Sequence, residues 1–146
     1  ADEQIVMTGD HVLPRISPNV GLGPFTSVPP LAAYVESLAA VSRFDDLEAL
    51  PGHEFRFRGL AARAEELRDH HVERSAELEA QVLRLAPTTT WTVAENARWA
   101  RGWDGLSVIA RRLALAETAA HLEDLRERGR LAASSEDDRM LWTASR

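Results

Sequence analysis

The feature that most constrains the fold is an uninterrupted amphipathic stretch from Gly59 to Leu85. Apolar residues recur there at the spacing of one helix face, with glutamate and arginine opposite. The stripe consists of Leu60, Ala64, Leu67, His71, Leu78, Val82 and Leu85. Pro87 ends the pattern and a run of threonines follows as a linker. The sequence therefore predicts one long helix and a domain boundary after it, with one domain at 1–86 and a second at 87–146.

The segment before the long helix mixes strand, loop and helix patterns. Ile5-Val6-Met7 reads as a short strand, and residues 13–23 are too interrupted by proline and glycine for regular structure. A helix is predicted from Pro30, where apolar residues return at helical spacing. Residues 44–50 then lead, like a strand, into the turn at Pro51-Gly52-His53. We expect an α/β arrangement for the first domain.

The second domain has its own order of elements. Thr92 is predicted to cap a short helix at 93–101, and a second helix is expected at 106–128, with a possible break near Leu113. Gly129 has the position of a C-cap, and two short strands flank an acidic turn at 134–138. Helix, turn, helix and hairpin is the order of a winged helix, so we expect a mainly α domain of that class.

Composition narrows the chemistry that the chain can carry. It has no cysteine, so any metal must be held by histidine and carboxylate side chains. The formal net charge of −6 argues against indiscriminate binding to phosphate backbones. No apolar run is long enough to cross a bilayer and no signal peptide opens the chain. We expect a cytoplasmic protein with no membrane partner.

Two loop residues are candidates for a metal site. Asp10 follows Thr8-Gly9 at the end of the first predicted strand, on the rim of a sheet where α/β proteins place ligands. His53 follows a strand-like segment and a Pro-Gly turn that sets its direction. Taken singly, an aspartate of this kind is more often part of a plain turn, and an exposed loop histidine is more often a bystander.

Together, the strings around these residues resemble the second half of the metallo-β-lactamase superfamily. The resemblance is carried by Met7-Thr8-Gly9-Asp10-His11-Val12-Leu13-Pro14-Arg15-Ile16-Ser17-Pro18-Asn19 and by Leu50-Pro51-Gly52-His53. The first string is similar to that of glyoxalase-II-like hydrolases. The C-terminal helices and hairpin look like the winged-helix domain of lactamase-β-2-like members. The resemblance implies the second half of a four-layer αββα fold followed by a winged helix.

The resemblance also implies a dinuclear metal site. Asp10 would bridge two divalent ions, with zinc favoured and iron or manganese as alternatives, and His53 would ligate the second ion. A metal-bound hydroxide would then attack an ester, thioester or related acyl carbonyl. His11 is a candidate catalytic residue that could contact substrate, although support of the loop from behind the site is the stronger reading.

The sequence departs from the family at one important point. The His-x-His-x-Asp-His cluster of the family lies upstream of the Gly-Asp strand, and nothing like it occurs here. His70-His71 cannot replace it because it lies within the long helix. Two ligands are too few for a dinuclear centre. We therefore expect a C-terminal fragment that is inactive alone, whose partner is the N-terminal half of the same fold.

The remaining histidines and tryptophans have simpler interpretations. His71 falls on the apolar stripe and is expected in the core, whereas His70 and His121 are expected at the surface. The four tryptophans are expected to build a small core or a domain interface in the second domain; they are Trp91, Trp99, Trp103 and Trp142.

The sequence thus favours a metal-dependent hydrolase acting on a small acyl or thioester substrate. One alternative is an RNA-acting nuclease of the same fold. The acidic hairpin turn counts against it, because Glu136, Asp137 and Asp138 would repel phosphates. The other alternative is a regulatory winged-helix module without catalysis. The sequence is also compatible with a homo-oligomer.

Overall fold

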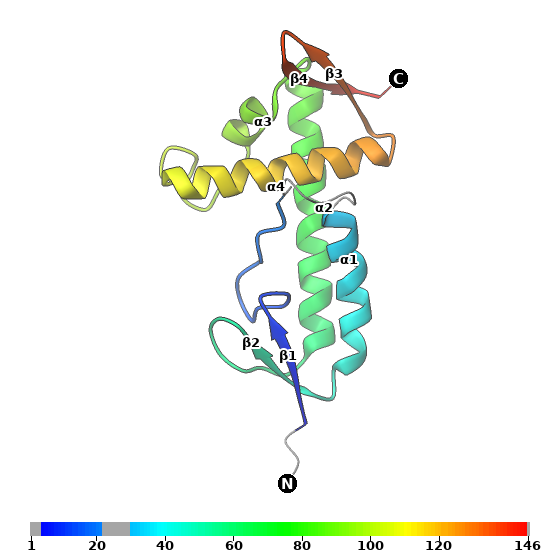
Figure 1. Ribbon diagram of the computed structural model, residues 1–146, viewed down its shortest axis with the longest axis vertical. Helices are drawn as coiled ribbons and strands as arrows, with labels where there is room; N and C mark the ends of the chain where they lie inside the picture. Colours follow the sequence, from blue (N-terminus) through cyan, green and yellow to red (C-terminus); the bar gives the residue numbers. More distant parts are fainter. Residues whose placement is uncertain (1–3, 22–29, 146) are drawn as a thin grey trace. The chain divides into compact units, whose positions relative to one another are not determined.

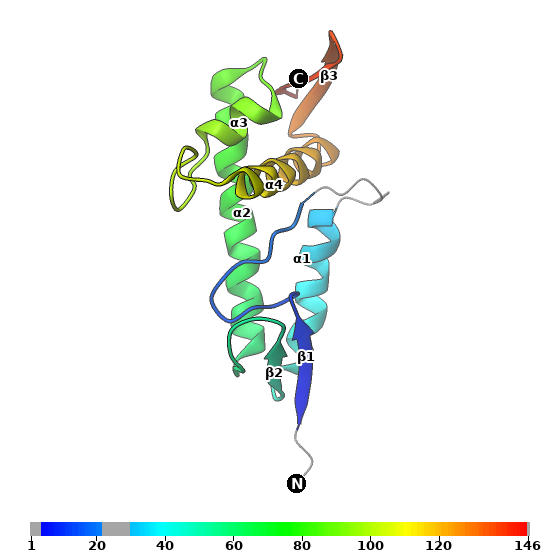
Figure 2. The ribbon, with the colours of Figure 1, turned by 60° about the vertical axis from the view of Figure 1, so that its left-hand side comes forward.

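The computed structural model describes residues 4–21 and 30–145 (Figures 1 and 2). The elements in chain order are β1 (Ile5–Gly9), α1 (Pro30–Val41), a 3-10 turn η1 (Ser42–Phe44), β2 (Glu48–Pro51), α2 (Leu60–Leu85), α3 (Thr90–Asn96), α4 (Val108–Glu127), β3 (Leu131–Glu136) and β4 (Arg139–Ala144). The α/β class expected from the sequence is confirmed, and α2 lies within one residue of the predicted long helix.

The chain divides into two compact units. Unit 1 comprises residues 1–19 and 33–71, and unit 2 comprises residues 20–32 and 72–146. The helix α2 contributes its first part to unit 1 and its second part to unit 2. The domain boundary expected near residue 86 concerns independently folding domains and stays a prediction.

Unit 1 is built on a two-stranded parallel sheet. Strand β1 pairs with β2 in the register Ile5↔Glu48 through Met7↔Leu50, and Thr8 is then an extra residue before Gly9↔Pro51. Parallel neighbours end at the same edge of a sheet, so the residues that follow both strands meet there. The core behind the sheet is formed by Val12, Leu38, Ala49, Leu60, Ala64 and Leu67.

Unit 2 contains the second part of α2, the helices α3 and α4, and the hairpin of β3 and β4. Side chains from all of these elements share one core, consisting of Leu78, Val82, Val93, Ala97, Leu122, Leu125, Leu131 and Trp142. Trp142 and Trp103 are buried as expected, whereas Trp91 is 49% exposed. The order of helices and hairpin expected from the sequence is present, while its assignment as a winged helix stays a prediction.

Single residues set the ends of the helices in unit 2. The cap of α3 is Thr89, whose hydroxyl accepts from the Thr92 backbone N–H, so the prediction of Thr92 as the cap is wrong. Thr92 lies inside the first turn instead. Helix α4 runs without a break to Glu127, and Gly129, two residues later, has φ +70°, where only glycine is at ease.

His121 does not lie at the surface, where the sequence analysis expected it. His121 is completely buried on α4, and its Nδ1 lies 2.8 Å from the hydroxyl oxygen of Ser75 on α2. The surface position expected for it is therefore wrong. It belongs to the buried face of α4 with Ala114, Thr118, Leu122 and Leu125, which recur at helical spacing.

None of the helices formed by residues 4–21 and 30–145 combines the length and the apolar character that a membrane crossing requires.

Candidate metal site

Asp10 lies directly after β1, at the edge of the sheet where both strands end. Gly9 has φ +52°, a conformation that glycine adopts without strain and that lets the chain turn sharply before the carboxylate. The turn closes with a hydrogen bond from the His11 backbone N–H to the Thr8 carbonyl, and the Thr8 hydroxyl donates to the carbonyl of Val12. The carboxylate side chain of Asp10 is 63% exposed.

His53 reaches the same edge from β2 and contacts Asp10. Its Nδ1 donates to Oδ1 of Asp10 across 2.6 Å, and the imidazole is 67% exposed. Since a carboxylate only accepts, this contact places a proton on Nδ1; in the neutral imidazole Nε2 then carries the lone pair, and this atom faces a metal in many histidine sites. The structure thus brings together the two residues that the sequence singled out, 43 positions apart.

The turn before His53 also needs its glycine. The Gly52 backbone N–H donates to the Gly9 carbonyl at 2.8 Å, which ties the two strand ends together. A Cβ on residue 52 would lie 2.6 Å from Oδ1 of Asp10, closer than real Cβ contacts come. Gly52 therefore makes room for the Asp10 carboxylate.

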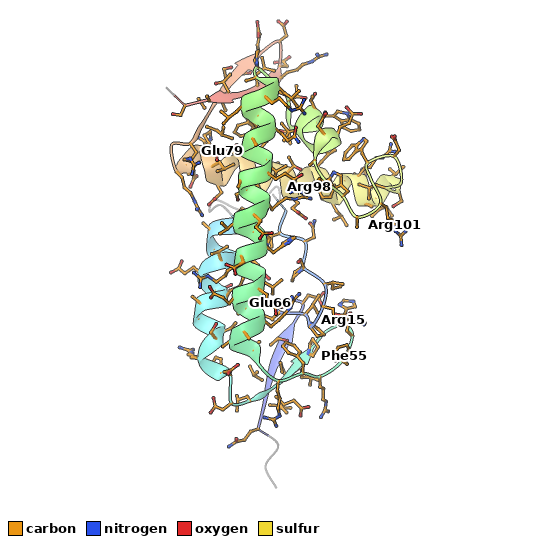
Figure 3. All side chains as sticks on the ribbon, turned by 180° about the vertical axis from the view of Figure 1, so that it is seen from behind. Arg15, Phe55, Glu66, Glu79, Arg98 and Arg101 are labelled. Carbon is orange, nitrogen blue, oxygen red and sulfur yellow. The ribbon has the colours of Figure 1, made fainter. Side chains whose placement is uncertain are left out.

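A second contact joins the loops around the two candidate ligands. Glu54 accepts from the backbone N–H of Arg15 at 3.1 Å and from its side-chain Nε at 3.0 Å. Partial burial by itself would raise the pKa of the Glu54 carboxyl, but the hydrogen bonds and charge of Arg15 outweigh it and hold the pKa below its ordinary value. Arg15 also lies over the ring of Phe55 (Figure 3).

Arg63 on α2 holds the loop from the other side. Its Nε donates to the carbonyl of Leu13 and its Nη2 to the carbonyl of Ile16, while Nη1 pairs with Glu66. Neither Glu54 nor Arg63 was expected at the site from the sequence. Glu54 could have been noticed from its position next to His53, whereas nothing in the helical pattern distinguishes Arg63 from other arginines on the polar face.

His11 points its ring nitrogen Nε2 at α1. Ser37 donates its hydroxyl proton to the Tyr34 carbonyl, so it accepts from Nε2 of His11 at 2.6 Å. Tyr34 donates to the His11 carbonyl and packs edge-on against its ring. Burial lowers the pKa of His11. These contacts favour the loop-supporting role for His11, and its catalytic role stays a prediction.

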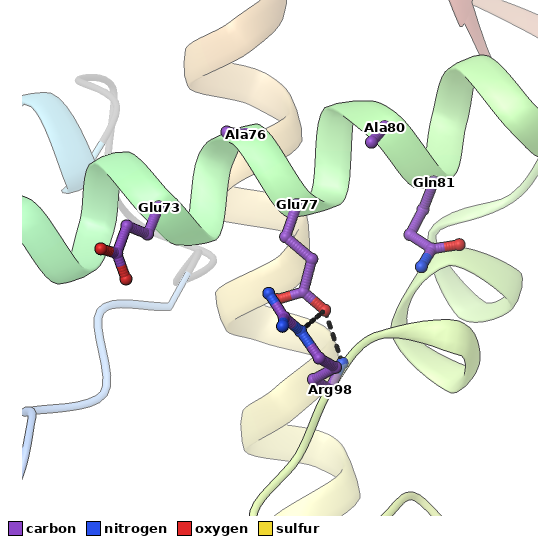
Figure 4. A pocket seen from close by; sticks show the side chains of 6 residues that line it. All are labelled: Glu73, Ala76, Glu77, Ala80, Gln81 and Arg98. Atoms are coloured by element: carbon purple, nitrogen blue, oxygen red, sulfur yellow. Dashed lines mark hydrogen bonds and ion pairs between the residues drawn. The ribbon is translucent and has the colours of Figure 1, made fainter.

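The other candidate residues lie elsewhere. His71 is buried, as expected, with its ring edge-on to Tyr34, and His70 is exposed, as expected. A separate open hollow on unit 2 is lined by Glu73, Ala76, Glu77, Ala80, Gln81 and Arg98 (Figure 4). Its most buried charge, Glu77, already accepts from the Arg98 backbone N–H and pairs with Arg74. We assign no site there.

Asp10 and His53 have the right donor chemistry for a divalent ion but are too few to hold one firmly. An aspartate oxygen and an imidazole nitrogen converge on one exposed edge, as a zinc, iron or manganese site requires. Among the described residues, no group of three or more histidine, aspartate or glutamate side chains could hold a metal. The pair fits as part of a larger ligand set.

Known proteins of similar structure point the same way. No protein-family model and no curated protein matches the chain. Among solved structures, it is similar to a β-lactamase domain protein from Burkholderia ambifaria, with 31% identity over 96% of this chain and a TM-score of 0.82. It is also similar to a metallo-β-lactamase family protein from Thermus thermophilus, with 31% identity over 98% of this chain and a TM-score of 0.80.

These similarities support the superfamily suggested by the two motifs. The chain spans 41% of the length of the first of these proteins and 42% of the second.

Proposed function

We propose that this chain forms the C-terminal part of a metal-dependent hydrolase, in which Asp10 and His53 are two of the metal ligands. One observation carries the proposal: two exposed side chains from the ends of adjacent parallel strands lie 2.6 Å apart at one edge of the sheet. The similarity to two solved structures of metallo-β-lactamase proteins supports it.

The missing ligands would come from an N-terminal half of the same fold. Parallel sheets are normally covered on both faces, and a two-stranded sheet rarely stands alone. In unit 1 Met7 of β1 is 80% exposed, as expected for a strand that the proposed N-terminal half would cover. We propose that the His-x-His-x-Asp-His cluster of the superfamily lies in that half and completes the site.

The substrate proposed is an ester, a thioester or a related acyl compound. Divalent ions, when bound, would activate water for attack on the carbonyl at neutral pH. Within this chain, Asp10 and His53 would hold the ions. Gly52 leaves room for the Asp10 carboxylate, and Glu54 ties the loop after His53 to the loop after Asp10 through Arg15. Zinc is the proposed metal, with iron and manganese as alternatives.

We further propose that residues 87–146 form a winged helix that contributes to the hydrolase and does not bind nucleic acid. The tip of the hairpin is acidic and exposed: Asp137 and Asp138 form the turn, and Glu136 is the last residue of β3. A loop of this charge would repel a phosphate backbone.

The test is the metal content of the whole protein that contains this chain. Asp10→Ala and His53→Ala should each lower the affinity for divalent metal at least about tenfold and abolish most thioester hydrolysis, because each removes a direct ligand. His70→Ala is the matched control, an exposed histidine on α2 outside the site. Unchanged metal content in both site variants would overturn the ligand assignment.

A further inference from the structure

Arg15 is an exposed cation beside the candidate metal site. It lies in the loop that follows Asp10, and the carboxylate that holds it belongs to Glu54, directly after His53. The Arg15 side chain is 71% exposed, whereas that of Glu54 is only 14% exposed. Glu54 therefore serves as a fixed anchor, and Arg15 carries its charge into solvent at the same edge (Figure 3).

Glu54 restrains Arg15 without occupying the two terminal nitrogens of its guanidinium, Nη1 and Nη2. Oε1 and Oε2 of Glu54 accept from Nε and from the backbone N–H of Arg15. The guanidinium carbon lies 5.2 Å from the centre of the Phe55 ring, so one face is covered as well. Within residues 4–21 and 30–145, no hydrogen bond occupies Nη1 or Nη2 of Arg15. These two groups form a pre-oriented pair of donors.

The backbone conformation of Glu54 indicates that the surrounding structure holds the contact between Glu54 and Arg15 in place. Glu54 has φ +72°, a conformation that residues other than glycine rarely adopt. Such backbone conformations persist where the surrounding structure determines them, and they cluster at binding sites. An exposed ion pair alone contributes little to stability, so stabilisation is a weak explanation for this strain.

We infer that Arg15 binds an anionic group of the substrate, a carboxylate or a phosphate, while the acyl bond lies at Asp10 and His53. The planar guanidinium offers two parallel N–H donors that match the oxygens of either anion, and it stays charged at every physiological pH. The inference rests on the proposed function for the acyl bond, but the anion site itself can be tested without any hydrolysis.

The first test is a titration of the whole, metal-free protein with inorganic phosphate, followed by NMR of the arginine Nε–H groups. The Arg15 signal should shift and saturate. In Arg15→Gln the saturable binding should disappear, and in Arg15→Lys it should weaken about tenfold, because lysine keeps the charge and loses the paired donors.

Arg43→Gln is the matched control. Arg43 is also exposed and lies over an aromatic ring, that of Phe44, but on another part of unit 1. Phosphate binding that is linear and unsaturated, or equal in wild type and Arg15→Gln, would overturn the inference. That result would leave the hydrolase proposal standing.

The second test locates the anionic group on the substrate. Two pairs of thioesters are compared. In each pair, one member carries a carboxylate where the other carries the corresponding amide. This group is on the acyl chain in the first pair and on the thiol in the second. Wild type should show a KM about 10- to 100-fold lower for the carboxylate member of one pair, and Arg15→Gln should remove the difference by raising that KM. A fall in kcat on all four substrates alike would show a structural role instead and contradict the inference.

Discussion

The position of the Asp10 carboxylate depends on the absence of a side chain at residue 52. A Cβ there would meet Oδ1 of Asp10 at 2.6 Å and the backbone carbon of Gly9 at 3.3 Å. The nearest atom is the end of a flexible side chain, which can move away at little cost to the fold. The effect of adding a methyl group should therefore fall on the proposed metal site.

We predict that Gly52→Ala lowers metal affinity at least about tenfold while the free energy of unfolding changes by less than about 1 kcal/mol. Metal content and thermal unfolding of the whole protein measure the two quantities. In an Asp10→Ala background the effect of Gly52→Ala on metal binding should vanish, since both changes act on the same carboxylate. Additive losses in the double variant would contradict this explanation.

At the residue scale, the sequence predicted the paired side chains of Asp10 and His53 but not the contacts that support their loops. Asp10 and His53 were visible because each follows a strand and a glycine. The contacts of Arg15 with Glu54, and of Arg63 with the loop carbonyls, join residues 39 to 50 positions apart. No local pattern predicts such pairs. His121 could have been found, because it shares the helical spacing of its buried neighbours.

At the scale of elements, Glu77 joins α2 to the segment that follows α3. It accepts from the Arg98 backbone N–H at 2.7 Å (Figure 4). It also pairs with Arg74, whose guanidinium lies 4.0 Å from the centre of the Trp99 ring. Partial burial by itself would raise the pKa of Glu77, but the hydrogen bonds and charges of Arg98 and Arg74 outweigh it and lower the pKa from 4.5. The ionised carboxylate therefore stabilises the folded protein.

We predict that Glu77→Gln costs about 1 kcal/mol of unfolding free energy at pH 7, because the amide keeps an acceptor and loses the charge. A lowered pKa in the folded state means that this contribution is complete above 4.5 and is lost as the pH falls through the folded-state value. Denaturant unfolding should show the difference from wild type shrinking as the pH is lowered through that value.

The neighbouring Glu73 provides the control for Glu77. It is exposed on the preceding turn of α2 and lines the same hollow. Glu73→Gln should leave stability unchanged at neutral and at acidic pH. An equal loss in the two variants, or a Glu77→Gln loss that does not depend on pH, would show that the ion pair is not the cause.

Element boundaries were predictable where a single residue sets them. Gly129 ends α4, and the Asp137-Asp138 pair, with φ values of +48° and +60°, closes the hairpin as a two-residue turn. The expected five-residue turn was too long because Ser134, Ser135 and Glu136 read as turn residues, although they pair with β4. Tertiary pairing overrode their local preference.

At the scale of the whole molecule, unit 1 contains the two proposed metal ligands and a sheet of two strands. Residues 1–146 alone should therefore bind zinc weakly, at least about a hundredfold less tightly than the whole protein, because each absent ligand removes a coordinate bond. Isothermal titration calorimetry of both proteins measures this. Tight stoichiometric binding by residues 1–146 would mean that the site has been misidentified.

The α/β character and the long helix were predictable because each rests on a regular repeat of apolar residues. The division of α2 between two compact units was not, because the stripe continues unchanged from Leu67 through Leu78. A repeat along a helix indicates that one face is covered and does not say by which partner. That information lies in contacts distant in sequence.

The parallel pairing of β1 and β2 bears on how such a site can diverge. The two proposed ligands are placed by short strings at strand ends 43 positions apart, and the interval contains α1, η1 and the loops that join them to β2. Insertions in those loops cost little, because the entropy of closing a loop grows slowly with its length. Related chains should therefore keep the two strings while the interval between them changes freely, so a search by fixed spacing would overlook true relatives.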